Sequence, residues 1–76
     1  MISTINIGKN GLSKSVIEEI KRRLEKEKIV KIRVLKNSPL REIYDKKTIG
    51  EVIVSNTNSI LLKNIGYTYI IKRKKK

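Results

Sequence analysis

The chain lacks cysteine and histidine, and these two absences exclude several classes of site. Without cysteine there are no disulfides, and without either residue the usual zinc sites and histidine acid–base catalysis are excluded. No apolar run approaches the roughly 20 residues that span a bilayer, and Met1 leads almost directly into a strand-like segment, so no signal peptide is visible. We therefore expect a soluble, cytoplasmic, non-enzymatic protein without a metal or cofactor.

Acidic residues are also scarce, and none follows Glu51. The 19 Lys and Arg residues against 7 Asp and Glu give a formal charge of +12. Such a surplus favours a polyanionic partner: RNA, DNA or an anionic membrane surface. The alternative is a compositional bias, since the chain has 14 Lys, 14 Ile and no Ala or Phe. A length of 76 residues allows one compact domain with a small core.

Alternating apolar residues predict two strands, over 2–7 and 29–35, with Lys31 and Arg33 on the polar face of the second. Between them, an apolar stripe at helical spacing predicts a helix over 14–26, with Ser13 as its N-cap. The exposed face of this helix carries Glu–Arg pairs at i,i+4 and is expected to be internally neutralised. The pairs are Glu18–Arg22 and Glu19–Arg23.

The residue pattern in the second half of the chain predicts one further helix and a hairpin. Ser38 and Pro39 suit a helix start, and apolar residues continue at helical spacing to Ile53, although the polar stretch 45–48 can divide the helix in two. The β-branched run 49–54 would also allow a strand, but its spacing favours a helix. Asn58 suits a left-handed helix end. Strands over 60–65 and 67–73, turning near Gly66, complete the order β-α-β-α-β-β.

The segment Gly8-Lys9-Asn10-Gly11 stands at the mouth of the first helix. Two glycines let the backbone turn sharply and approach a ligand closely, and loop N–H groups beside a helix N-terminus suit a phosphate. Lys9 adds a charge, and Lys14 lies near the positive end of the helix dipole, where a cation is unfavourable unless an anion visits. The spacing fits neither a Walker loop nor a Rossmann fingerprint. The alternative is an ordinary tight strand–helix connection.

Four patches in order resemble the CRM domain (chloroplast RNA splicing and ribosome maturation), or YhbY family. They are "IGKNGLSKSVIEEI", "KIVKIRVL" and, within "EVIVSNTNSILLKNIGYTYIIKR", the helix end and the hairpin. The resemblance covers roughly residues 5–73. It implies an α/β fold: a single small two-layer domain with a four-stranded mixed sheet and two helices. This fold is similar to the C-terminal domain of initiation factor three and, through the Gly-x-x-Gly (GxxG) loop, distantly KH-like.

The resemblance divides the chain into an RNA-binding domain over 1–73 and a basic tail over 74–76. It implies binding of structured ribosomal or precursor RNA, with a role in maturation of the large ribosomal subunit. By position, it matches Gly8–Gly11 to the family's RNA-contacting loop. Together with the local reasoning, the candidate RNA-binding residues are Gly8, Lys9, Asn10, Gly11, Ser13, Lys14, Lys31, Arg33 and Arg73. The chain departs from the family at Asn58, where glycine is usual, and at Lys72, where tyrosine is usual. It also has only residues 1–4 where bacterial members carry a helix before the first strand, so one surface is expected to be uncovered.

Other interpretations remain open. Tyr67 and Tyr69 could form a stacking platform, although the core is the favoured place for Tyr69. Lys31 and Arg33 could face RNA or merely solvent. The chain could instead bind DNA generally, or it could bind itself or a protein through apolar residues on both faces of the last strands, as in Leu61 and Leu62. No nucleophile–base or carboxylate pair suggests an enzyme.

Overall fold

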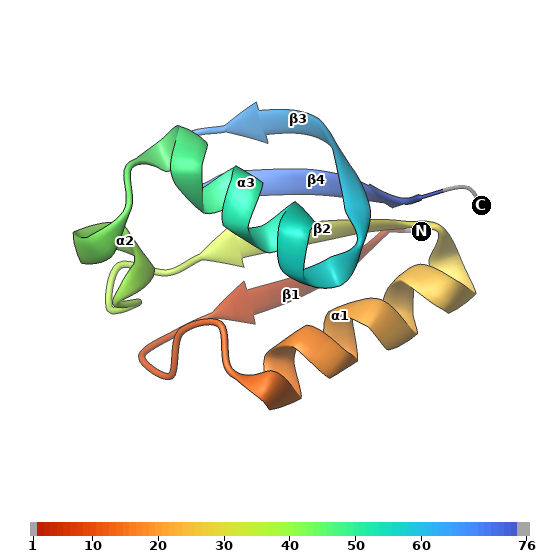
Figure 1. Ribbon diagram of the computed structural model, residues 1–76, viewed down its shortest axis with the longest axis horizontal. Coiled ribbons are helices and arrows are strands. Elements are labelled where there is room, and N and C mark those ends of the chain that lie inside the picture. The colour runs from red at the N-terminus through yellow and green to blue at the C-terminus, as the bar shows by residue number, and fades with distance from the viewer. Residues whose placement is uncertain (1, 75–76) are drawn as a thin grey trace.

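The computed structural model describes residues 2–74 and shows one sheet with its two long helices on the same side (Figure 1). The long helices lie in front of the sheet in this view, and a short helix lies at the end where β1 and β2 finish. The elements are β1 (Ser3–Ile7), α1 (Lys14–Glu27), β2 (Ile29–Val34), α2 (Leu40–Ile43), α3 (Lys46–Thr57), β3 (Ser59–Ile65) and β4 (Thr68–Arg73).

The four strands lie in the order β1-β2-β4-β3. β1 and β2 are parallel, as expected of strands joined by a helix, and the other two pairings are antiparallel. The predicted two-layer α/β fold with a four-stranded mixed sheet is therefore confirmed. The prediction of two helices was incomplete, because the second is divided into α2 and α3.

The core forms between the sheet and the two long helices. Its fully buried side chains include Ile20 of α1, Ile53 of α3 and Tyr69 of β4. Gly50 allows α3 to approach the sheet closely, because a Cβ atom there would lie 3.1 Å from the ring of Tyr69. The Tyr69 hydroxyl donates a hydrogen bond to the Lys46 carbonyl at 2.5 Å, which satisfies the ring's polar end. The expectation that Tyr69 belongs to the core is confirmed.

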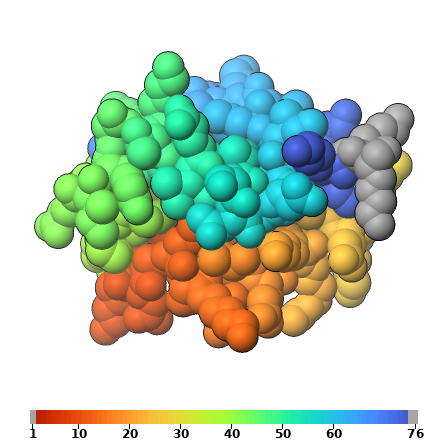
Figure 2. Space-filling model, viewed as in Figure 1, coloured from red at the N-terminus to blue at the C-terminus, as the bar shows by residue number. Residues whose placement is uncertain are grey.

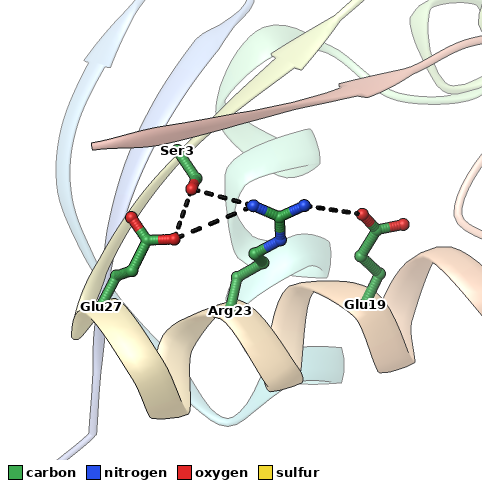
Figure 3. A network of polar contacts seen from close by, with 4 residues as sticks. All are labelled: Ser3, Glu19, Arg23 and Glu27. Atoms are coloured by element: carbon green, nitrogen blue, oxygen red, sulfur yellow. Dashed lines mark hydrogen bonds and ion pairs between the residues drawn. The ribbon is translucent and has the colours of Figure 1, made fainter. Parts of the chain in front are cut away.

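Helix α1 begins and ends close to its predicted bounds. Its N-cap is Ser13, whose hydroxyl accepts a bond from the Val16 N–H at 3.4 Å. Arg23 contacts Glu19 at 3.6 Å and Glu27 at 3.9 Å, and it donates to the hydroxyl of Ser3 on β1 (Figure 3).

These contacts confirm one of the two predicted i,i+4 pairs, Glu19–Arg23, and tie α1 to the start of β1. The other predicted pair, Glu18–Arg22, is not among the ion pairs within 4.0 Å that the structure shows in residues 2–74. Both of its side chains are exposed, where an ion pair gains little.

The division between α2 and α3 follows from local capping. Tyr44 is extended, and Asp45 becomes the N-cap of α3 by accepting a bond from the Thr48 N–H at 2.7 Å. That bond lowers the pKa of the Asp45 carboxyl. At the other end of α3, Asn58 adopts the predicted left-handed conformation, with φ 51° and ψ 53°.

Candidate nucleic-acid interface

The segment Gly8–Gly11 forms a turn between β1 and α1. The Gly11 N–H donates a hydrogen bond to the Gly8 carbonyl at 3.0 Å, which closes the turn on itself. In Figure 2 this part of the chain projects at the end of the molecule, beside the segment that contains α2. The tip of the turn, Lys9 and Asn10, is therefore exposed shortly before the N-terminus of α1.

The two glycines of the turn are under different constraints. Gly11 has a φ of +63°, which disfavours any other residue, and a Cβ atom there would lie 3.1 Å from Cγ of Pro39. Gly8 has no such backbone requirement, and an added Cβ would make ordinary contacts of 3.7 Å with Asn37 and 3.8 Å with Leu35. The turn itself thus explains the glycine at Gly11 but does not explain the one at Gly8.

Hydrogen-bond donors gather at this turn. Lys9 and Asn10 are exposed, and no protein acceptor for their backbone N–H groups occurs within residues 2–74. Lys14 is exposed in the first turn of α1, where no acidic residue offsets it. Since Ser13 caps only one of the first N–H groups of the helix, the turn and the helix N-terminus together can bind an anion.

Lys31 and Arg33 lie on the uncovered face of the sheet. Both are exposed, whereas their neighbours on β2, including Ile32, are buried against the helices. Arg33 pairs across the sheet with Asn6 of β1 and with Thr68 of β4, so it lies near the end where the GxxG turn begins. Lys31 is two residues further from that end.

Acidic residues are absent from the strands. All seven lie in the three helices or cap α3, whereas the strands carry five basic residues, Lys31, Arg33, Lys63, Lys72 and Arg73. Positive charge is therefore concentrated on the sheet. The net charge of +12 alone does not show where the charge lies.

The structure does not bring Arg73 to the turn. Arg73 lies beside the start of β2, where its N–H donates to the Lys28 carbonyl, while the turn follows the strand ends. The length of β2, Ile29–Val34, separates these ends by about 17 Å at about 3.3 Å per residue. The Arg73 guanidinium donates to the Glu25 carbonyl near the end of α1, a structural contact. Of the predicted tail, residues 75 and 76 lie outside the described residues.

A cluster around Tyr67 was missed by the residue patterns. The Tyr67 ring is half-buried, with the Arg41 guanidinium carbon 3.7 Å and the Lys46 Nζ 5.3 Å from its centroid. These are cation–π distances. No sequence signal joins the three residues, because they come from α2, α3 and the turn before β4. Burial raises the pKa of the Tyr69 phenol, and the charge interaction with the Tyr67 phenol raises it further.

Two further kinds of site receive no support from the described residues. Within residues 2–74, no group of three or more acidic, cysteine or histidine side chains is placed to hold a metal ion. In the same range, none of the helices combines the length and the apolar character needed to cross a bilayer.

Known proteins resemble this chain over most of its length. The CRS1/YhbY (CRM) domain family matches residues 1–73. The "Probable RNA-binding protein YqeI" of Bacillus subtilis is 30% identical over 70 residues, which are 92% of this chain and 69% of that protein. The solution structure of hypothetical protein SAV1595 from Staphylococcus aureus, described as a candidate RNA-binding protein, has a TM-score of 0.70 and 33% identity. It covers 93% of this chain and 70% of that one.

Proposed function

The chain belongs to the CRS1/YhbY (CRM) domain family, and on that premise we propose that it is a non-enzymatic RNA-binding protein. It binds structured ribosomal or precursor RNA and acts in the cytoplasm during maturation of the large ribosomal subunit. The RNA-binding names of two relatives support the ligand class. The GxxG turn holds the RNA backbone, and the basic sheet face supplies long-range attraction.

The turn is the observation that carries this proposal. It offers backbone N–H groups at Lys9 and Asn10 immediately before a positive helix N-terminus, and the turn itself gives no reason for glycine at Gly8. A phosphate oxygen is the acceptor that suits such a cluster of donors. Phosphate contacts fix position rather than sequence, so RNA shape should dominate recognition.

The cations nearest the turn complete the proposed site. Ser13 orders the start of α1, Lys14 places an ammonium group in its first turn, and Arg33 lies near the same end on the open sheet face. Lys31 and Arg73 lie further away and would contribute charge at a distance. Their exposure makes that contribution sensitive to salt.

The test is fluorescence anisotropy with a structured ribosomal RNA fragment and a DNA duplex of equal length, across a salt series. The loop variant Lys9→Asp/Asn10→Asp is compared with the control Lys26→Glu/Asn56→Asp at the far end of α1 and α3. Each double variant lowers the net charge by three, two at the lysine and one at the asparagine. Circular dichroism first establishes that both fold.

We expect RNA to bind more tightly than DNA, and the loop variant to lose at least about tenfold more RNA affinity than the control, since one or two contacts are worth about 1–3 kcal/mol. If RNA and DNA bind alike and both double variants weaken binding equally, the protein is a general polycation. A DNA-binding function would then replace the proposal.

One observation favours a second candidate function, a protein-interaction surface. Ile60, Leu62 and Ile65 of the edge strand β3 are between 44 and 57% exposed, whereas Leu61 packs against the core. Apolar residues at a sheet edge can take up a partner, although the irregular pairing at Leu61/Lys63 and the lysine itself oppose simple edge-to-edge pairing. Sedimentation equilibrium with the triple variant Ile60→Thr, Leu62→Thr and Ile65→Thr tests self-association. If the wild type is also monomeric at all concentrations, self-association is excluded.

A further inference from the structure

A hollow of about 380 Å³ lies beside the GxxG turn and shares only Arg33 with the phosphate site described above. It is formed where β2 leaves the sheet, between the following turn, α2 and the start of β4. Its polar lining consists of Arg33, Lys36, Arg41, Tyr67 and Thr68. The volume is near the lower end of the range of about 300–1,000 Å³ that small-ligand sites occupy. The hollow can therefore take one nucleotide and is too small for a duplex.

The hollow has an aromatic wall that is already fixed in place. The Tyr67 carbonyl accepts a bond from the Val34 N–H at 2.9 Å, which holds its backbone against β2. The Arg41 guanidinium lies 3.7 Å from the ring centroid. A nucleic-acid base stacks favourably on a guanidinium plane, and because Arg41 covers one face of the Tyr67 ring, a base in the hollow would stack on this guanidinium, which the ring supports from behind. Because the pair forms without ligand, little ordering is required on binding.

The remaining polar lining is cationic. Arg33, Lys36 and Arg41 line the hollow, and no lining residue is acidic. The only ion pairs within 4.0 Å among residues 2–74 belong to Arg23 on α1, so these three cations are not neutralised by a carboxylate in that range. An anionic ligand with a flat apolar part, such as a nucleotide, matches this combination of charge and aromatic surface.

The hollow and the turn share a wall. Leu35 lines the hollow, and its side chain is 3.8 Å from the place of a Cβ atom on Gly8. Its N–H also donates to the Ile7 carbonyl at 2.9 Å, directly before the turn. An RNA strand whose backbone is held at Lys9 and Asn10 therefore passes next to the hollow.

We propose that this hollow binds one unstacked RNA nucleotide, with its base on the Tyr67–Arg41 pair and its phosphate near Lys36. The inference rests on the proposed RNA-binding function and gives it a place of base contact. Any base can stack, so the hollow prefers an unpaired nucleotide over a paired one rather than one base over another. This preference would direct the protein to loops and bulges of structured RNA.

The test uses a single-stranded RNA hexamer and a hexamer with the same sugar–phosphate backbone but no bases. Anisotropy is measured with the wild type and with the variants Tyr67→Leu, Tyr67→Phe and Lys36→Gln. We expect the wild type to bind the base-bearing RNA roughly 5- to 150-fold more tightly, the fold-change that corresponds to about 1–3 kcal/mol per stacked base. Tyr67→Phe retains this preference, and Tyr67→Leu loses it.

Lys36→Gln serves to separate charge from stacking. It should weaken both hexamers by the same factor, and the control Lys26→Gln, at the opposite end of the molecule, should weaken both less. The comparison of two RNAs on one protein remains informative even if the Tyr67→Leu variant folds poorly.

Two results would overturn the inference while leaving the proposed function in place. In the first, both hexamers bind the wild type equally, while structured RNA still depends on the GxxG turn. In the second, a base preference exists and folded Tyr67→Leu retains it, so that the bases bind elsewhere. Failure of the wild type to bind any of these RNAs would instead remove the proposed function itself.

Discussion

Alanine substitutions at Gly8 and Gly11 should have opposite effects on stability. An L-residue in the left-handed region costs about 1–2 kcal/mol, and Gly11 has a φ of +63°. Alanine also restricts the unfolded chain more than glycine does, and this offsets about 0.4–1 kcal/mol of that cost. The new methyl group would also lie 3.1 Å from Cγ of Pro39, which must shift. We expect Gly11→Ala to lower the free energy of unfolding by about 1–2 kcal/mol.

Gly8→Ala lacks both penalties, because its φ is not in the left-handed region and the added methyl group makes ordinary contacts. The lower conformational entropy of the unfolded alanine variant is then the main effect. The free energy of unfolding should rise by up to about 1 kcal/mol or stay unchanged. Urea denaturation followed by circular dichroism measures both variants. For a domain of this size, the gap between them corresponds to several degrees or more in Tm.

RNA binding by the same two variants separates structure from function. If Gly8 is glycine because RNA approaches the backbone closely, then Gly8→Ala should bind structured RNA at least about tenfold more weakly while remaining as stable as the wild type. Two results would refute this reasoning. One is equal destabilisation by both substitutions. The other is a Gly8→Ala variant with full RNA affinity, which would show that the turn needs glycine only at Gly11.

Substitutions at three other positions test how the fold supports this end of the molecule. Tyr69→Phe should cost about 0.5–1.5 kcal/mol in urea denaturation through loss of the bond to the Lys46 carbonyl. Because burial raises the pKa of Tyr69, the wild type should lose stability as pH rises above about 10, and this variant should lose less over the same range. If the wild type and Tyr69→Phe lose stability equally with rising pH, Tyr69 is not the group that causes the loss. The Thr48 N–H lowers the pKa of Asp45, so Asp45→Ala should lower the Tm at neutral pH. Asp45→Asn keeps a side-chain oxygen that can cap α3, so this variant should retain the Tm at neutral pH. It should also lose less stability than the wild type as pH falls below about 4. An unchanged Tm in Asp45→Ala would show that Asp45 does not stabilise α3 as its N-cap. Gly50→Ala gains about 1 kcal/mol of helix propensity but places a methyl group against the ring of Tyr69, and overpacking of about 1–3 kcal/mol should make the net effect destabilising. A more stable variant in the same assay would show that the ring can move aside.

The elements that could be predicted are those with a local physical signal. The alternation along β2 places Ile32 inside and Arg33 outside, and the structure confirms both. Ser13 and Asn58 carry capping signals that depend only on neighbouring residues, and both adopt the expected geometry. The break in the second helix was foreseen as an alternative, but its position was fixed by the competition between Asp45 as a cap and continued helix.

The candidate site was predictable only in part. The GxxG turn is contiguous, so its residues could be named from the sequence alone. The hollow could not, because Arg33, Arg41 and Tyr67 meet only through the β2–β4 pairing and the placement of α2. Arg73 illustrates the reverse problem. It was a candidate RNA-binding residue, but the antiparallel direction of β4 carries it to the end of the sheet opposite the turn.

We propose that RNA binds at the end of the molecule formed by the GxxG turn and the adjoining hollow. The most direct measurement is a titration of ¹⁵N-labelled protein with a structured ribosomal RNA fragment, following the backbone amide signals. We expect the largest shifts or broadening at residues 8–14, 35–37 and 67–68, with little change around Glu25 and Arg73. The largest changes at the Arg73 end, or an even distribution over all exposed lysines, would contradict it.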